Sequence, residues 1–472
     1  MKKTKEGITV KKEKDISEWY SEVVQKAELA DYSPVKGFMI IRPNAYSIWE
    51  KIQKYFDDYL KRKNIRNAYF PLLIPESFFK KEAEHAKGFE PELAWIEKTE
   101  EGERLAIRPT SETIMYDSFS KWIRSWRDLP LKINQWCNVL RWEVKQTKPF
   151  LRTREFLWQE GHCVYETKEE CDKEVREILE EYEKLCGEFL AIPVVSGTKT
   201  EAEKFAGAHY TASIEALMPN GKSLQMGTSH NLGQGFAKSF NINFKDKNEK
   251  SQIPWQSSWG ISTRLIGAVI LIHGDDKGLV LPPKIAEKKV VIVPILFKEK
   301  NKNVIKKVVE IEKKLSEFNA FYDLREEYSA GWKFNEWEMK GIPIRVEIGP
   351  NDLKKKQVVL VRRDTGKKEF VKETELKKKV SKMLDDIQKN LFKKAEKFLK
   401  ENTVEAKNYN EFKKAIKNRK MVCIYFCEDE KLEKKIKEET GATSSCIPFN
   451  GKIGKCIFTG KTGRMTFFAR AY

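Results

Sequence analysis

The pattern of apolar and polar positions first becomes regular about forty residues into the chain. Apolar side chains there recur every three or four positions and would form one stripe along a helix: Tyr46, Trp49, Ile52, Phe56 and Leu60. The helix is predicted to end near Lys63, and the apolar run 68–73, which contains Pro71, is predicted to be a strand. Packing of this pair in a core is the simplest interpretation.

A second pattern begins after the two prolines at 282–283. Residues 290–295 are continuously apolar and predict a buried strand, and an amphipathic helix is predicted over 303–318. Further strands at 344–348 and 358–362 alternate with helices. This alternation indicates a compact α/β module about a hundred residues long.

A long amphipathic helix is predicted over 377–400, because its apolar positions keep helical spacing: Val380, Leu384, Ile387, Leu391, Ala395 and Phe398. Its lysines are expected mainly to form a solvated face, with contact to an RNA backbone as the minority alternative. The remaining residues, 401–472, predict a small α/β domain.

The length and composition of the chain indicate how many domains it has and which partners its charge suits. A chain of 472 residues and 55.2 kDa is expected to hold roughly two to four domains. Hydrophobic residues make up 40% and aromatic residues 11%, which is enough for packed cores. The formal net charge of +19 suits a polyanionic partner such as RNA, although a lysine-rich surface explains the charge equally well.

The chain is expected to be a cytoplasmic protein. Residues 1–16 are charged and lack the apolar centre of a secretory signal, and no apolar run approaches the ~20 residues that span a bilayer. The eight cysteines are scattered and predict reduced thiols rather than a disulfide framework: Cys137, Cys163, Cys171, Cys186, Cys423, Cys427, Cys446 and Cys456.

Two predicted strands joined by a basic loop carry the first candidate chemistry. One strand covers 131–136 and leads to Arg141, and the other returns over 150–156 with Arg152. Arginines held in this way would bind the two ends of a triphosphate. A surface hairpin with salt bridges is the alternative, but it does not require Trp158, Glu160 and His162 close behind the arginines. The chain has no P-loop and no Rossmann glycine pattern.

These segments resemble the motifs of class II aminoacyl-tRNA synthetases. Residues 131–163 resemble motif 2 in its prolyl-specific form, the helix and Pro71 segment over 38–75 resembles motif 1, and 259–284 resembles motif 3. The segments 108–112 and 225–233 also resemble the prolyl enzyme. The chain is thus similar to prolyl-tRNA synthetases of the archaeal and eukaryotic type, in class IIa.

The resemblance implies three domains. Residues 1–286 would form an α+β catalytic domain with an antiparallel sheet and flanking helices, and motif 1 would make a homodimer. Residues 287–395 would form an α/β anticodon-binding domain, and 396–472 a small α/β C-terminal domain. The implied function is ATP-dependent attachment of L-proline to tRNA(Pro) through a prolyl-adenylate, releasing AMP and pyrophosphate.

The resemblance also implies a set of substrate-binding residues. Thr110 and Glu112 would hold the imino nitrogen of proline, where a carboxylate meets a secondary ammonium, and Trp158, His162 and His230 would surround the ring. The residues implied for ATP and Mg²⁺ are Arg141, Glu143, Arg152, Thr153, Phe156, Gln225, Thr228 and Arg264. Arg141 and Arg264 are expected to act as electrostatic catalysts, and no general base is assigned.

In the second domain, the resemblance implies that Glu347 accepts hydrogen bonds from a guanine of the anticodon, with Arg345 nearby. The family often has a basic residue where this chain has Asn351, so one contact is expected to be missing. Trp332, Phe334 and Trp337 are interpreted as core residues.

The tail departs from the family's four-cysteine zinc domain. Cys427 and Cys456 match two of the ligands, but their partners fall at Leu432 and Thr459, which do not bind zinc. We therefore expect no structural zinc, with a rearranged site that uses Cys423 and Cys446 as the alternative. The end, 467–472, still resembles the family's C-terminus, whose terminal tyrosine returns towards the catalytic domain.

Two rival functions stay open on sequence grounds. One is a threonyl or seryl enzyme of the same class, although no catalytic zinc ligands for threonine can be placed. The other is a non-catalytic tRNA-binding paralogue, which would not need the arginines. Only about a hundred residues separate His162 from Gly260, so a large editing insertion is absent and some activation of alanine is expected.

Overall fold

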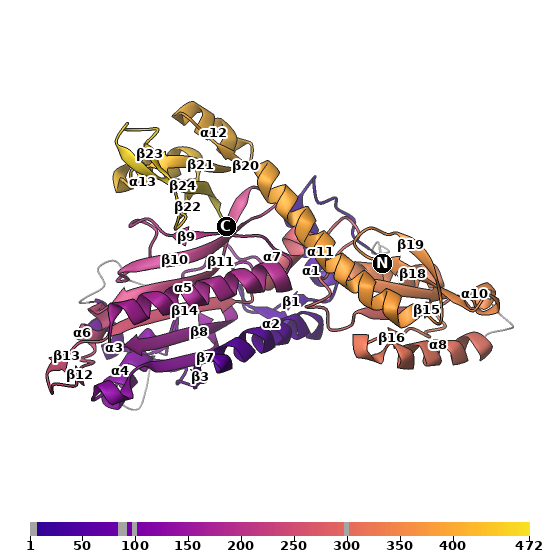
Figure 1. Ribbon diagram of the computed structural model, residues 1–472, viewed down its shortest axis with the longest axis horizontal. Helices are drawn as coiled ribbons and strands as arrows, with labels where there is room; N and C mark the ends of the chain where they lie inside the picture. The colour runs from indigo at the N-terminus through magenta and orange to yellow at the C-terminus, as the bar shows by residue number, and fades with distance from the viewer. Residues whose placement is uncertain (1–6, 84–91, 97–101, 297–301) are drawn as a thin grey trace.

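The computed structural model describes residues 7–83, 92–96, 102–296 and 302–472. Figure 1 shows an N-terminal domain in indigo to magenta, a middle domain in orange, and a tail domain in yellow at the C-terminal end. Helix α11 (Leu376–Asn402) runs from the middle domain to the tail domain, so residue 395 lies inside a helix. Among the described residues, no helix is long and apolar enough to cross a membrane.

One large sheet forms the centre of the N-terminal domain. Its antiparallel strands lie in the order β10 (Tyr210–Leu217), β11 (Lys222–Gly233), β14 (Trp255–Ser262), β8 (Glu155–Tyr165) and β7 (Leu131–Leu140), with β9 (Val195–Thr198) beside β10. The expected antiparallel sheet is confirmed for these strands. Two further strands make the sheet mixed: β3 (Arg66–Asn67) pairs in parallel with β7, and the tail strand β24 (Thr462–Ala471) pairs in parallel with β11. Both parallel strands are connected to their partners by long segments, as parallel pairing requires.

Helix α2 (Pro43–Arg62) confirms the first predicted helix, and it ends before Lys63 as expected. Pro43 occupies its first turn, where no backbone N–H is needed. Four residues of the predicted apolar stripe are buried, but Tyr46 is 42% exposed. The stripe therefore reaches the protein surface at the first turn of the helix.

The predicted strand over 68–73 was wrong. Short strands form on either side of it instead, at β3 and at β4 (Leu73–Pro75). Pro71 cannot donate a hydrogen bond to a neighbouring strand. The backbone N–H of Phe70 donates to the side-chain oxygen of Gln135 rather than to a strand.

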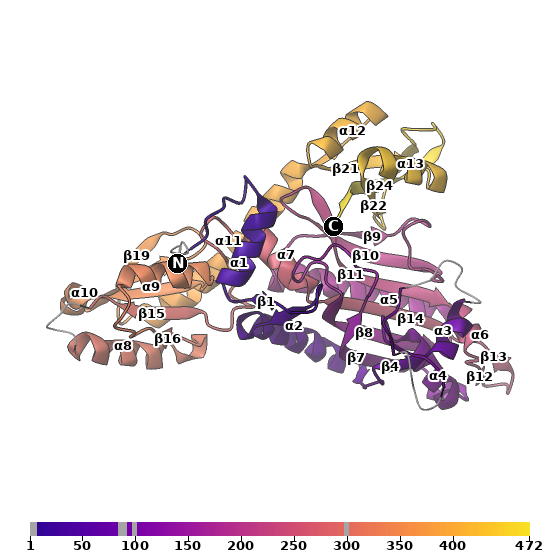
Figure 2. The ribbon, with the colours of Figure 1, turned by 180° about the vertical axis from the view of Figure 1, so that it is seen from behind.

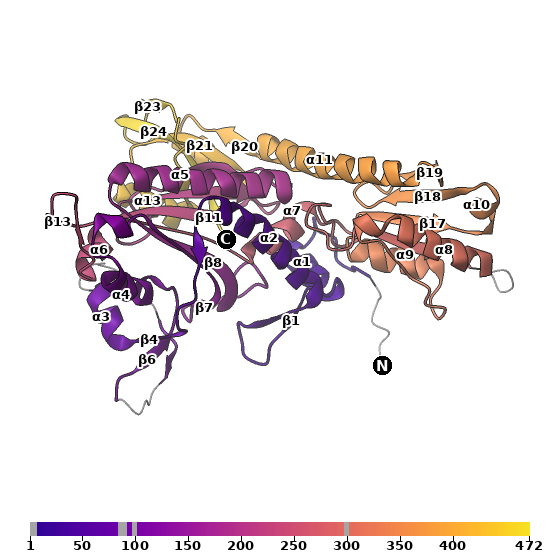
Figure 3. The same ribbon diagram turned by 60° about the horizontal axis from the view of Figure 1, so that its bottom comes forward.

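The main core of the N-terminal domain lies between the large sheet and its helices. Figure 3 shows α5 (Lys168–Lys184) lying along the sheet, and Trp19, Trp49, Phe56, Tyr182 and Trp259 are fully buried in this core. The other helices and short strands of the domain are α1 (Ile16–Lys26), β1 (Ala30–Tyr32), β2 (Met39–Ile41), α3 (Glu76–Ala83), β5 (Trp95–Ile96), β6 (Leu105–Ile107), α4 (Glu112–Trp122), α6 (Gly235–Ser239), β12 (Phe244–Lys245), β13 (Ser251–Gln252) and α7 (Arg264–His273).

The middle domain is a five-stranded sheet in the order β16 (Phe321–Tyr322), β15 (Val290–Pro294), β17 (Ile344–Ile348), β18 (Gln357–Arg362) and β19 (Lys368–Lys372). The predicted strands at 290–295, 344–348 and 358–362 are confirmed. Helices α8 (Lys302–Lys314) and α11 share one buried cluster with this sheet. The remaining helices of the domain are α9 (Ala330–Met339) and α10 (Pro350–Lys354).

Two details of the middle domain differ from the predictions. The helix predicted over 303–318 stops at Lys314, and a 3-10 turn covers Ser316–Phe318. Trp332, Phe334 and Trp337 are only partly buried. Trp337 packs edge-on against Phe321 with ring centroids 4.8 Å apart.

The tail domain confirms the predicted small α/β unit. It contains β20 (Thr403–Glu405), α12 (Tyr409–Lys417), β21 (Met421–Phe426), α13 (Glu430–Thr440), β22 (Ala442–Cys446), β23 (Ile453–Lys455) and β24. Strand β24 joins the tail to the large sheet, and the backbone N–H of Tyr472 donates to the Ser223 carbonyl (3.2 Å). The expected return of the terminal tyrosine to the N-terminal domain is confirmed.

Cys427 and Cys456 lie near the same threonine in the tail domain. The Thr459 hydroxyl donates to the sulfur of Cys427 (3.5 Å), and hydrogen bonds from Thr459 and Phe458 help to lower the pKa of the Cys456 thiol against the opposing effect of burial. Thr459 thus occupies the position that a fourth zinc ligand would need. The absence of structural zinc stays a prediction.

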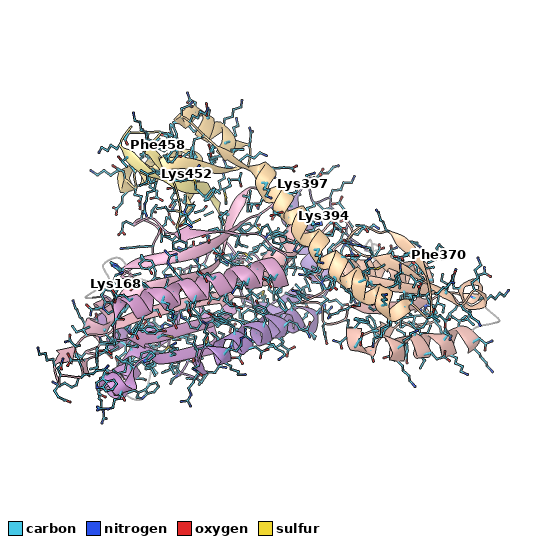
Figure 4. All side chains as sticks on the ribbon, in the orientation of Figure 1. Lys168, Phe370, Lys394, Lys397, Lys452 and Phe458 are labelled. Atoms are coloured by element: carbon cyan, nitrogen blue, oxygen red, sulfur yellow. The ribbon has the colours of Figure 1, made fainter. Side chains whose placement is uncertain are left out.

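A cavity of about 760 Å³ lies where the three domains meet, lined among others by Lys12, His273, Asp364, Lys394 and Arg419. Figure 4 labels Lys394 on α11, and its ammonium group donates to the Asp364 carbonyl (2.9 Å). Figure 2 shows α1 at this junction. The lining contains none of the residues predicted to bind proline or ATP.

Candidate active site

A strip of small side chains crosses the middle of the large sheet on β14: Ser258, Gly260 and Ser262. Strand pairing sets larger side chains beside it: His162 and His230 next to Ser258, Glu160 and Thr228 next to Gly260, and Trp158 next to Ser262. Alternate residues of a strand share one face, so all of these point to the same side of the sheet. A Cβ atom added to Gly260 would lie 2.9 Å from the Gln159 backbone oxygen, so this position stays small.

Thr110 and Glu112 stand at the start of α4, and both side chains are buried. The Thr110 hydroxyl donates to a carboxylate oxygen of Glu112. Ligand atoms of Glu112, Glu160 and His162 lie within 4.8 Å of one another, and no other such group of three occurs in the part of the chain that the structure describes. Two buried carboxylates therefore lie on this side of the site.

His162 is tied to two partners. Its Nε2 lies 3.1 Å from a carboxylate oxygen of Glu160, and its Nδ1 lies 3.1 Å from the Tyr116 hydroxyl. Burial alone would lower the pKa of His162, but the hydrogen bond to Glu160 and the charge of Glu112 outweigh burial and raise it. The same pairing with His162 lowers the pKa of Glu160 against the opposing effect of burial. Both shifts favour the ionised form of the pair.

His230 has the opposite protonation behaviour. Its Nδ1 lies 2.9 Å from the Thr211 hydroxyl, its Nε2 lies 3.0 Å from the Thr228 hydroxyl, and its ring centroid is 5.0 Å from that of Phe205. Burial, helped by the charge of His162, lowers the pKa of His230 to about 3. His230 is therefore neutral at physiological pH and offers a largely apolar ring.

Three guanidinium groups gather at the other side of the strip. Arg264, the first residue of α7, donates to the Leu151 carbonyl (3.3 Å) and to the Gln225 carbonyl (3.2 Å). Burial and the positive charges of Arg141 and Arg152 lower the pKa of Arg264 to about 10, so it stays protonated near neutral pH. Like charges held this close favour binding of a polyanion.

The loop between β7 and β8 carries two of these arginines. Arg141 directly follows the last residue of β7, so the first strand leads to it as predicted, but β8 begins only at Glu155, so the predicted strand position of Arg152 was wrong. The loop is nevertheless ordered, because the N–H of Arg141 donates to the Arg154 carbonyl (2.7 Å) and Lys148 pairs with Arg152. The guanidinium of Arg141 lies 5.6 Å from the Phe156 ring.

The other residues predicted for ATP lie around this loop. The Thr153 hydroxyl donates to the Glu155 carbonyl (2.7 Å), and Glu143 is exposed in the turn after Arg141. Gln225 and Thr228 are on β11. The structure therefore brings all predicted residues of the N-terminal domain to β8, β11, the β7–β8 loop and the starts of α4 and α7.

Comparison with known proteins covers almost the entire chain. Residues 95–273 match the family described as tRNA synthetase class II core domain (G, H, P, S and T), 289–383 match the anticodon binding domain, and 409–472 match prolyl-tRNA synthetase, C-terminal. The proline–tRNA ligase of Natranaerobius thermophilus is 50% identical over 467 residues, which is 97% of this chain and 96% of that protein. The proline–tRNA ligase of Rubrobacter xylanophilus is 51% identical over 469 residues, which is 98% of each chain.

The chain belongs to the prolyl-tRNA synthetases. It is a class II aminoacyl-tRNA synthetase with proline–tRNA ligase activity, its core uses ATP, and its substrates are proline and tRNA(Pro). Proline–tRNA ligase 2 of Clostridioides difficile is 48% identical over 476 residues, which is 99% of this chain and 98% of that protein. The family assignment excludes the threonyl and seryl alternatives.

The middle domain of this synthetase presents a polar face opposite α8 and α11. Arg345 donates to Glu347 through Nε (3.1 Å) and Nη2 (2.9 Å), and Lys368 donates to the other carboxylate oxygen of Glu347 (2.9 Å). Strand register sets Glu347, Val359 and Phe370 in one row. Phe370, which Figure 4 labels, is 67% exposed on the edge strand β19.

Several residues of the proposed site received no role from the sequence. Tyr116 and Glu160 contact His162 directly, Ser111 donates to Glu160, and Phe205 packs on His230. Three of them had a local signal: Ser111 lies between Thr110 and Glu112, Tyr116 lies one helical turn after Glu112, and Glu160 lies on the same strand face as Trp158 and His162. Phe205 comes from a distant segment.

Proposed function

We propose that proline and ATP react across the β14 strip and that the prolyl group then passes to tRNA(Pro). A carboxylate oxygen of proline attacks the α-phosphorus of ATP, and pyrophosphate leaves. The terminal 3′-hydroxyl of the tRNA then attacks the carbonyl carbon of the adenylate, and AMP leaves. One observation carries the proposal: Glu112 and the three arginines Arg141, Arg152 and Arg264 flank the same strip from opposite sides.

The proline end of the site would use the residues around Glu112. The Glu112 carboxylate and the Thr110 hydroxyl would bind the secondary ammonium group, because a buried carboxylate attracts a cation strongly. Trp158, His162 and His230 would surround the pyrrolidine ring. The neutral state of His230 suits an apolar ring, since no charge has to be desolvated when proline binds.

The ATP end would use the arginines for alignment and charge. Arg141 would bind the α-phosphate, and Arg152 and Arg264 the β- and γ-phosphates, while Phe156 stacks on adenine. Thr153, Gln225 and Thr228 would line the nucleotide. Catalysis then comes from positioning and from stabilising charge on the phosphate oxygens, without a general base. The test is ATP–pyrophosphate exchange, which should depend on proline.

Mg²⁺ is the metal that we propose for this site. The exposed carboxylate of Glu143 and the side-chain oxygen of Gln225 are hard oxygen donors, the kind that magnesium uses beside phosphates and water. Bound with ATP, the ion would neutralise charge on the phosphate oxygens. The protein groups fit this role because magnesium needs only one or two carboxylates.

We also propose that the chain forms a homodimer through the motif 1 segment. We propose the cytoplasm, where proline is attached to tRNA(Pro), as its location. Three large apolar side chains in this segment are exposed, Ile40, Tyr46 and Tyr69, and Tyr32 and Val35 are exposed just before it. A patch of this kind is typical of a protein interface. Light scattering in solution should give twice the chain mass of 55.2 kDa, whereas a mass of one chain would exclude the dimer.

For the anticodon, we propose that Glu347 accepts hydrogen bonds from a guanine edge, with Arg345 holding the carboxylate in place. Glu347→Gln replaces one of the two acceptor oxygens with a donor. We expect kcat/KM for tRNA(Pro) in aminoacylation to fall about 10-fold, because a wrong base contact costs ~1–3 kcal/mol. ATP–pyrophosphate exchange, which needs no tRNA, should not change.

The matched control for this variant is Glu310→Gln on α8, which is exposed on the other side of the middle domain. It should leave both assays unchanged. Equal charging of tRNA(Pro) by the Glu347→Gln and wild-type enzymes would show that Glu347 does not contact the anticodon.

A further inference from the structure

Glu160 has no role in the reaction described above, yet its carboxylate joins the residues proposed to bind proline. It lies on β8 between Trp158 and His162 and is 2% exposed. A buried carboxylate is costly unless its oxygens are fully hydrogen-bonded. The donors that bind the Glu160 carboxylate therefore indicate which parts of the site its charge holds in place.

The carboxylate of Glu160 has partners on three elements. One oxygen accepts from the backbone N–H of Ser111 (3.2 Å) and lies 3.1 Å from Nε2 of His162. The other oxygen accepts from the Ser111 hydroxyl (2.5 Å), from Nε2 of Gln135 (3.1 Å) and from the Cys137 thiol (3.4 Å).

Two of these contacts transmit the position of Glu160 to proposed proline-binding residues. Ser111 stands between Thr110 and Glu112, so its two hydrogen bonds to Glu160 fix the turn that starts α4. The sulfur of Cys137 accepts from the indole N–H of Trp158 (3.3 Å), which holds that ring against the strip.

We propose that Glu160 is a positioning residue for proline: it holds Ser111, His162 and Trp158 in one arrangement, so that Glu112 faces the substrate ammonium. The inference rests on the proposed proline site. Glu160 would not touch the substrate. Its effect would be on the affinity for proline rather than on the phosphate chemistry.

The charge of Glu160 also sets the protonation of His162. The groups that face His162 are Glu160 on its own strand, Glu112 and Tyr116 on α4, and His230 on β11. Without the Glu160 charge, burial would gain weight and the pKa of His162 would fall. A neutral His162 would donate from one ring nitrogen only. It could then no longer donate to the Tyr116 hydroxyl and to the side chain at position 160 at the same time.

Glu160→Gln in the full-length enzyme tests this inference by ATP–pyrophosphate exchange. We expect KM for proline to rise about 10-fold to 100-fold, the size of one lost buried hydrogen bond to a charged group, while KM for ATP stays within about twofold. The apparent pKa in the pH profile of kcat/KM for proline should shift downward. The temperature of unfolding should change little, because the amide has the shape of the carboxylate.

Glu174→Gln is the matched control. Glu174 is also buried, but it lies on α5 and accepts from Ser257, on the opposite face of the sheet. This variant should leave KM for proline unchanged. Ser111→Ala, which removes one donor to Glu160, provides a second test and should raise KM for proline by a smaller factor.

Three outcomes would overturn the inference. The first is an unchanged KM for proline in Glu160→Gln. The second is an equal rise of KM for proline and for ATP together with a lower temperature of unfolding, because that result would assign Glu160 to general stability. The third concerns the proposed site itself: if Glu112→Gln also leaves KM for proline unchanged, the proline site is elsewhere.

Discussion

Arg141→Ala is expected to lower kcat for proline-dependent ATP–pyrophosphate exchange by about 10²-fold to 10³-fold. A preorganised donor aimed at a charge that develops in the transition state contributes ~3–4 kcal/mol. Arg141 meets this description, because the N–H of its backbone is fixed by Arg154 and its guanidinium is held near the Phe156 and Trp158 rings. KM for proline should change much less than kcat.

Arg124→Ala is the control for this prediction. Arg124 is an exposed arginine between α4 and β7 and has no proposed contact with either substrate. Its replacement should leave exchange at the wild-type level. If Arg141→Ala retained wild-type exchange, the assignment of the arginine cluster to ATP would be wrong.

Glu112→Gln should have the second large effect, on proline binding. The carboxylate is 4% exposed and accepts from Thr110, so proline would bring its ammonium to a buried and fixed charge. Removing one member of a buried charge pair costs ~2–5 kcal/mol. We therefore expect KM for proline to rise about 10²-fold or more, as measured by ATP–pyrophosphate exchange, with KM for ATP nearly unchanged.

Asp117→Asn on the same helix controls for effects on α4. Asp117 accepts from Lys121 at the protein surface, and this variant should bind proline normally. A Glu112→Gln enzyme with wild-type KM for proline would mean that another group binds the ammonium.

The elements that the sequence predicted well have a strong local signal. Helix α2 shows a helical stripe of large apolar residues, and β15 is apolar enough to be buried on both faces, so periodicity and length identify both. The prediction over 68–73 failed because apolar composition says nothing about backbone partners. There the backbone of Phe70 bonds to a distant side chain, Gln135.

The parallel strands of the large sheet could not be predicted from local sequence patterns. Strand β24 pairs with β11 through only two residue pairs, Lys222 with Arg470 and Ser223 with Ala471, which are about 250 residues apart in the chain. Such a contact depends on how two domains pack. The resemblance indicated the return of Tyr472, but it did not indicate that the tail extends the catalytic sheet.

The proposed site, too, could be predicted only in part. The resemblance supplied the residues that would meet the substrates, and the structure added the residues that hold them. Glu160 could have been suspected from its place between Trp158 and His162. Ser111 lies between Thr110 and Glu112, but its hydrogen bond to Glu160 could not be predicted, because the two residues are 49 positions apart in the chain.

The amino acid that the purified enzyme attaches to tRNA(Pro) tests the central claim most directly. Aminoacylation should be measured with each of the standard amino acids in turn, with ATP and Mg²⁺ present. We expect proline to be attached fastest and alanine to be activated more weakly. A pocket that distinguishes two amino acids only by the size of a small apolar group favours one of them by ~1–3 kcal/mol. No attachment of proline, or faster attachment of another amino acid, would contradict the account.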